Sequence, residues 1–175
     1  MSTARDHAQR DRDAALERLE RFLAIPSVSA VSAHAGDVRA AAEWLAARMT
    51  AAGIDGVRID ATPGHPVVTG RRDVAPGLPT VLVYGHYDVQ PPEPLEAWLS
   101  PPFQPTRRDG AVYARGAADD KGQVMVHVEA AAAFAAAGGP PVNLRYAFEG
   151  EEEIGSPNLR SWLLDHAREL GADVA

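Results

Sequence analysis

The sequence contains no cysteine among its 175 residues. Disulfides therefore contribute nothing to the fold, and any bound metal must be held by His, Asp and Glu side chains. A basic stripe is also missing, and the formal net charge is −7. This disfavours nucleic acid as the main partner, because phosphate binding needs clustered Lys and Arg, and it disfavours an anionic membrane surface for the same reason.

Long apolar runs are absent as well. No stretch approaches the roughly 18 apolar residues needed to span a bilayer, and the polar opening MSTARDHAQRDRDAA lacks the apolar core of a signal peptide. We therefore expect a soluble, cytoplasmic protein. With 46% hydrophobic and 23% charged residues, the composition is that of an ordinary globular protein, and the length suffices for one domain with a core.

Hydrophobic periodicity predicts helices that alternate with short strands. The helices are expected over 11–25, 37–53 (with Asp37 as N-cap), 123–138 and 157–170 (with Ser156 as N-cap), and the strands over 56–60, 65–70, 80–85, 111–115 and 142–148, with a further strand starting in 171–175. The run TVLVYG is apolar and is predicted to be an internal strand, buried on both faces. The alternation predicts an α/β fold with a largely parallel sheet, whose sites gather beyond the carboxyl ends of the strands.

His86 and Asp88 lie just beyond the TVLV run, within YGHYDVQ. Residues two apart in an extended chain point to the same side, so the Asp88 carboxylate can lie beside the His86 ring. It could then fix the tautomer of the ring, as carboxylates do for metal-binding histidines. A partly buried histidine satisfied by a neighbouring acid explains this motif equally well.

Two adjacent acids, Asp119 and Asp120, stand between two glycines in RGAADDKG, at the entrance to a predicted helix. Negative charge stabilises a helix N-terminus, which explains one of the two acids. A metal ligand on a tight turn is the functional alternative, and one carboxylate can bridge two cations. We favour Asp119 as the ligand, although spacing alone does not separate it from Asp120.

Four carboxylates fall within five residues in EGEEE, 149–153. A charge run is usually a solvated face, but this one follows a strand that we expect to be buried. A divalent cation nearby would relieve the repulsion among these acids, and a neighbouring acid could act as general base. Together, the three motifs place an imidazole and hard oxygen ligands at one edge of a sheet, a donor set that suits Zn²⁺, Mn²⁺ or Co²⁺ in a hydrolytic site.

The segments YGHYDVQPP, WLSPPFQPTRRDGAVYARGAADDKG and EGEEEIGS resemble the three successive site motifs of the M20 family of metallopeptidases. The resemblance extends from about residue 16 to 175, and GHYDVQP is most similar to the dipeptidase branch, of the carnosinase and cytosolic nonspecific dipeptidase kind. It implies a three-layer α/β/α zinc-exopeptidase-like catalytic domain with a mostly parallel mixed sheet. The implied activity is the metal-dependent hydrolysis of dipeptides or short peptides.

The resemblance also implies roles for individual residues. His86 would bind one metal, and Asp88 would orient the His86 side chain. Asp119 would bridge two divalent cations. The expected ion is Zn²⁺, and Mn²⁺ and Co²⁺ are alternatives. In this family the peptide bond after the corresponding Asp is often cis. Glu152 would be the general base and Glu153 a ligand of the other metal.

Members of this family are more than twice as long as this chain. The resemblance therefore implies that residues 1–175 form the N-terminal part of a catalytic domain. The remaining ligands and the smaller domain that often forms the homodimer would lie elsewhere. Three alternatives stay open: an amidohydrolase acting on N-acyl amino acids, of the deacetylase or desuccinylase type; a catalytically inactive fragment; and an acid-rich cation-binding module.

Overall fold

The computed structural model describes residues 2–175. The α-helices are α1 (Ala4–Arg10), α2 (Arg12–Leu23), α3 (Ala35–Ala51), α4 (Lys121–Ala136) and α5 (Leu159–His166). The strands are β1 (Asp55–Asp60), β2 (Val67–Arg72), β3 (Thr80–His86), β4 (Thr106–Arg108), β5 (Ala111–Tyr113) and β6 (Asn143–Glu149). Short 3-10 turns are η1 (Ser32–His34), η2 (Leu95–Ala97) and η3 (Glu152–Ile154). Within this described range, no helix is both long and apolar enough to cross a bilayer.

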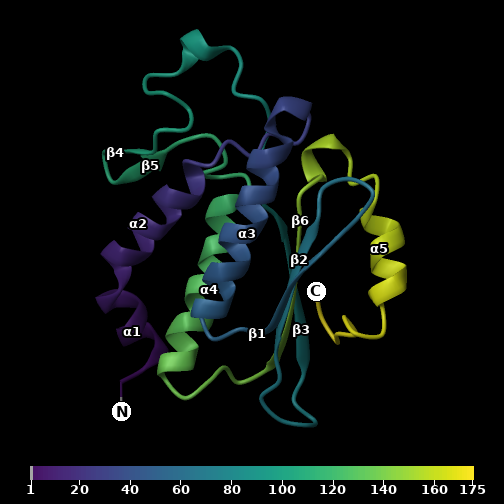
Figure 1. The fold of residues 1–175 in the computed structure, drawn as a ribbon. Helices are drawn as coiled ribbons and strands as arrows, with labels where there is room; N and C mark the ends of the chain where they lie inside the picture. Colours follow the sequence, from purple (N-terminus) through teal and green to yellow (C-terminus); the bar gives the residue numbers. More distant parts are fainter. Residues whose placement is uncertain (1) are drawn as a thin grey trace.

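Helices cover both faces of a central sheet, which confirms the three-layer α/β/α fold (Figure 1). On one face α3 and α4 pack against the sheet, with α1 and α2 beside them, and the main core lies there; it includes Phe22, Leu45, Met49, Val128 and Phe148. On the other face α5 closes a smaller core of Val67, Ala147, Trp162 and Leu170. The β4–β5 hairpin forms a separate two-stranded sheet.

The central sheet is mixed and has the order β1-β2-β6-β3. β2 runs antiparallel to both of its neighbours, whereas β3 runs parallel to β6. Among these named strands the antiparallel pairs outnumber the parallel pair, because the β1–β2 hairpin adds to the sheet beside the parallel β6–β3 pair. An additional parallel bridge joins Val81 to Val174, so that the predicted strand at the end of the sequence pairs with β3.

β3 differs from its predicted position. It is less buried than predicted: within the described residues it has on its outer side only the single bridge to Val174, and Tyr84 is 46% exposed. An apolar sequence predicts burial but does not say how many strands lie on each side of it. The register matters more for the site: β3 and β6 end together, with His86 opposite Glu149.

Both predicted N-caps are wrong. α3 begins at Ala35, because η1 leads directly into it, and Asp37 therefore lies in its first turn with Oδ2 2.6 Å from Nδ1 of His34. α5 begins at Leu159 with Asn158 as its N-cap residue, and it spans less than the predicted 157–170. Ser156 adopts a left-handed φ of 51°, and its hydroxyl donates to Glu149 instead of capping the helix.

Candidate metal centre

Three loops meet beyond the carboxyl ends of β3 and β6. The first loop follows β3 and carries Asp88, just after His86 at the end of the strand. The second precedes α4 and carries Asp119, and the third follows β6 and contains the η3 turn with Glu152 and Glu153. The parallel pairing of β3 with β6 brings the first and third loops together, as expected for the strand ends of an α/β sheet.

His86, Asp119 and Glu153 lie close enough to share one metal ion. Each offers a ligand atom, and these atoms all lie within 4.8 Å of one another. His86 is nearly buried, whereas the Asp119 side chain is 75% exposed. Imidazole nitrogen and carboxylate oxygen are both ligands of zinc, and they also suit related divalent ions. The described residues thus fit a divalent cation at this position.

The His86 ring lies between two acids. Nε2 is 3.0 Å from Oδ1 of Asp119, and on the other side Nδ1 is 3.4 Å from Oδ1 of Asp88 and 3.2 Å from its backbone oxygen. Burial lowers the pKa of His86, but the hydrogen bond and charge of Asp88, with the charges of Asp120 and Glu152, outweigh it and raise the pKa to about 9. The ring nitrogen that faces Asp119 is the one that would exchange its proton for a cation.

Asp88 organises more than the histidine. Its side chain is fully buried and accepts a hydrogen bond from the Ser29 hydroxyl at 2.6 Å. The same carboxylate accepts from the backbone N–H groups of Glu152 (3.2 Å) and Glu153 (3.1 Å). Asp88 therefore fixes the positions of the His86 ring and of the acidic turn relative to each other.

The two adjacent acids before α4 face different partners. Asp119 points to the His86 ring, whereas Oδ2 of Asp120 accepts a hydrogen bond from the backbone N–H of His86 at 3.1 Å. The peptide bond between them is cis, as the resemblance implies. Burial raises the pKa of Asp120, although its bond to the His86 backbone and the His86 charge oppose the shift. Geometry thus separates two residues that spacing could not.

Glu152 lies beside the three candidate ligands without being one of them. Its Oε2 is 3.8 Å from Nε2 of His86, and its side chain is 43% exposed. Its backbone is held by Asp88, so the carboxylate is positioned while it remains open to solvent. A carboxylate so placed can exchange protons with a water or a leaving group next to the cation position.

The other two acids of the 149–153 run have structural partners. Glu149 is buried, and its Oε1 accepts from the Ser156 hydroxyl at 2.8 Å and from the Tyr84 hydroxyl at 2.5 Å. Burial raises the pKa of Glu149, against the effect of these two hydrogen bonds. Glu151 accepts from Asn158 at 2.9 Å and from the backbone of His65 at 3.1 Å, so it ties the β1–β2 turn to the site loop.

Two glycines allow the loops to approach this closely. A Cβ at Gly85 would lie 2.6 Å from Oδ2 of Asp120, and one at Gly150 would lie 2.4 Å from the hydroxyl oxygen of Tyr87. Both distances are shorter than real Cβ contacts. The glycines before His86 and in EGEEE therefore serve the packing of the site.

Sequence reasoning missed three supporting residues. Ser29 bonds to Asp88, and Gln90 donates to Glu153 at 2.7 Å. Lys121 is fully buried and donates to the backbone oxygens of Phe22 and Ile25, which anchors the start of α4 to the end of α2. Burial lowers the pKa of Lys121 to about 7. The alternation His86, Asp88, Gln90 was a signal for Gln90, because i, i+2 and i+4 share a side of an extended chain.

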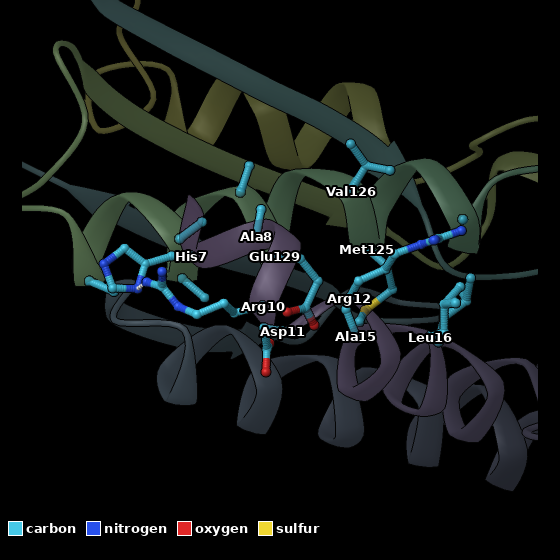
Figure 2. Close-up of a pocket in the computed structure, with 16 residues that line it drawn as sticks. His7, Ala8, Arg10, Asp11, Arg12, Ala15, Leu16, Met125, Val126 and Glu129 are labelled. Atoms are coloured by element: carbon cyan, nitrogen blue, oxygen red, sulfur yellow. Dashed lines mark hydrogen bonds between the residues drawn. The ribbon is translucent and has the colours of Figure 1, made fainter. Parts of the chain in front are cut away.

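A cavity of about 670 Å³ lies away from this site, between α1–α2 and α4 (Figure 2). Apolar side chains line most of it, including Ala8, Ala15, Leu16 and Met125. Its Glu129 is already paired with Arg18 and Arg48. The cavity contains none of the predicted site residues, so the candidate chemistry belongs to the open loop cluster instead.

The chain is similar to members of one known peptidase family. Residues 82–175 match the model of peptidase family M20/M25/M40. A cysteinylglycine-S-conjugate dipeptidase of Corynebacterium striatum is 33% identical over 165 residues, which cover 94% of this chain and 36% of that protein. A succinyl-diaminopimelate desuccinylase of Xylella fastidiosa is 49% identical over 78 residues, 44% of this chain and 21% of that protein.

A solved structure, that of human carnosine dipeptidase 1, aligns with a TM-score of 0.90 at 28% identity, over 98% of this chain and 39% of that one. The chain thus spans little more than a third of the length of these dipeptidases. The predicted family and fold class are confirmed by the family model and by the aligned structure. The chain belongs to peptidase family M20/M25/M40.

Proposed function

We propose that the protein acts in the hydrolysis of dipeptides, with a divalent cation held by His86, Asp119 and Glu153. The observation that carries the proposal is the mutual distance of their ligand atoms, all within 4.8 Å, at the carboxyl ends of β3 and β6. Zn²⁺ is the preferred ion, with Mn²⁺ and Co²⁺ as alternatives, because the donor set is one imidazole with carboxylates and no thiolate.

Each residue has a role that its position supports. The bound cation supplies Lewis-acid polarisation of the scissile carbonyl and a lowered pKa for the attacking water. Glu152, beside the ligands and partly exposed, takes the proton from that water and returns it to the leaving amine. Asp88 orients His86 and holds the Glu152–Glu153 backbone.

We further propose a pair of cations bridged by Asp119. Its largely exposed carboxylate has two oxygens, of which Oδ1 faces His86. A pair needs more ligands than the three donors brought together here, because catalytic zinc sites use about three protein ligands per ion. The chain would then be the N-terminal part of a catalytic domain, and the remaining donors would come from outside this cluster.

Dipeptides are preferred over N-acyl amino acids as substrates because the dipeptidase relative matches 94% of this chain, whereas the desuccinylase matches 44%. The matched desuccinylase segment has the higher identity, 49% against 33%, and therefore keeps the acyl-amino-acid activity as a second candidate.

Hydrolysis assays of the metal-loaded protein separate these possibilities. The substrates are Cys-Gly and β-Ala-His on one side and N-succinyl and N-acetyl amino acids on the other, with Glu152→Gln as the inactive control. Dipeptide hydrolysis that is lost in Glu152→Gln supports the proposal, whereas faster hydrolysis of the N-acyl substrates overturns the substrate class. Tight metal binding without hydrolysis of either class would favour the inactive fragment.

A further inference from the structure

Gln90 contacts a candidate metal ligand directly. Its Nε2 donates to Oε2 of Glu153 at 2.7 Å and to the backbone oxygen of the same residue at 3.2 Å. A carboxylate only accepts hydrogen bonds, so the amide nitrogen of Gln90 is the group that can face it. The bond leaves Oε1 of Glu153 free of this contact.

The backbone on either side of Gln90 is fixed. Val89 is fully buried, its N–H donates to the Ser27 oxygen at 3.0 Å, and it forms a parallel bridge with Val28. On the other side, the Pro91 oxygen accepts from the Arg115 guanidinium at 3.1 Å. Because the backbone of Gln90 is already ordered, its side chain loses less conformational entropy on forming a hydrogen bond than it would on a mobile segment.

Glu153 is consequently held at three points by one short segment. Asp88 accepts from its backbone N–H, while Gln90 donates to its backbone oxygen and to its carboxylate. The residues that hold it follow the strand that ends at His86, so one ligand and the supports of another come from the same stretch, 86–90.

We propose that Gln90 is a positioning residue for Glu153: its amide binds one carboxylate oxygen and turns the other toward the cation. This inference rests on the proposed metal site. Partners behind a ligand commonly change metal affinity by about 10–100-fold, and a charged acceptor makes this hydrogen bond stronger than a neutral one.

The test is the titration of Zn²⁺ into the metal-free chain and its variants. Gln90→Met keeps the length of the side chain but removes the donor, and Gln9→Met, an exposed glutamine on α1, is the matched control. We expect Gln90→Met to weaken the affinity about tenfold, with the thermal midpoint of the metal-free chain unchanged because Gln90 is exposed. The visible absorption of bound Co²⁺, which reports ligand geometry, should shift in Gln90→Met and not in Gln9→Met.

A double-mutant cycle with Glu153→Ala shows whether Gln90 acts through Glu153. In the Glu153→Ala background, Gln90→Met should cause no further loss of affinity. Equal losses in both backgrounds, or an affinity of Gln90→Met equal to that of Gln9→Met, would overturn the positioning role while the metal site stands. Unchanged affinity in both Glu153→Ala and His86→Ala would instead overturn the metal site itself.

Discussion

The carboxylate of Asp88 accepts a hydrogen bond from the backbone N–H of Glu153 at 3.1 Å, across 65 positions of sequence. The same carboxylate lies beside the His86 ring, 3.4 Å from Nδ1. A buried acid thus sets the distance between two candidate ligands that come from different strand ends. If the metal site is as proposed, its geometry depends on Asp88 as much as on the ligands.

Asp88→Asn tests this dependence. The variant keeps the shape of the side chain but replaces one carboxylate oxygen with an amide NH₂. The Ser29 hydroxyl and the backbone N–H groups of Glu152 and Glu153 all donate to this side chain, so a donor then faces another donor. We expect metal affinity to fall about 10–100-fold and stability to fall by about 1–3 kcal/mol. Isothermal titration and urea unfolding give the two values, with Asp165→Asn, an exposed residue of α5, as control. A metal affinity equal to that of the control would show that Asp88 does not set the geometry of the metal site.

Two serines of one loop offer a matched pair. The Ser29 hydroxyl donates to the Asp88 carboxylate at 2.6 Å, and the Ser27 hydroxyl donates to the Tyr87 backbone oxygen at 2.7 Å; both side chains are buried. Each Ser→Ala variant should lose about 1 kcal/mol of stability, as for a typical hydrogen bond. Only Ser29→Ala should weaken Zn²⁺ binding, because only it releases Asp88. Equal metal affinities in the two variants would contradict the prediction.

Acid should destabilise the chain through Glu129. Burial raises the pKa of this residue, but the hydrogen bonds from Arg18 and Arg48 outweigh it and lower the pKa below the usual 4.5. A group with a lowered pKa in the folded state stabilises the fold above its unfolded pKa, and this contribution is lost as pH falls through the folded value. The free energy of unfolding should therefore decrease below about pH 4.5 less steeply in Glu129→Gln than in the wild type.

The control for this experiment is Glu43→Gln. Glu43 pairs with Arg39 on the surface, where both side chains are more than half exposed, and such pairs contribute little. Its unfolding free energy, measured by urea titration from pH 7 to pH 3, should follow the wild type. A Glu129→Gln profile parallel to that of Glu43→Gln would refute the assignment.

Gly85 is predicted to be intolerant of a side chain. An added Cβ would lie 2.6 Å from Oδ2 of Asp120 and 2.9 Å from Cγ2 of Val124. Gly85→Ala should cost about 1–3 kcal/mol, as overpacking does. Gly36→Ala in α3, where an added Cβ meets nothing within 4 Å, should stabilise the chain by up to about 1 kcal/mol because alanine favours the helix. Thermal midpoints that move in the same direction would contradict the packing argument.

Local pattern predicted most of the fold. Helices α2, α3 and α4 and strands β3 and β6 lie within a few residues of their predicted ranges, because each carries an apolar face of matching period. α1 was missed because it buries none of its residues. Its capping box, in which Asp6 N–H donates to the Thr3 hydroxyl and Thr3 N–H donates to Asp6, was the signal available in the sequence.

The site was predictable in part. The i, i+2 spacing placed Asp88 beside His86, and the structure agrees. The hydrogen bonds that Asp88 accepts from the backbone N–H groups of Glu152 and Glu153 could not be predicted, since they depend on the parallel register of β3 with β6. The different orientations of Asp119 and Asp120 could not be predicted either, because two neighbouring residues on a turn follow no periodic pattern that would assign them to different sides.

The central claim, a divalent cation held by His86, Asp119 and Glu153, is tested most directly by isothermal titration of Zn²⁺ and Mn²⁺ into the metal-free chain. The comparison is a His86→Ala, Asp119→Ala double variant, with a His34→Ala, Asp37→Ala variant as control, since that pair also places an imidazole beside a carboxylate, at the start of α3. Our account predicts tight binding in the wild type and the control, and its loss in the double variant. Equal binding in all three proteins would contradict it.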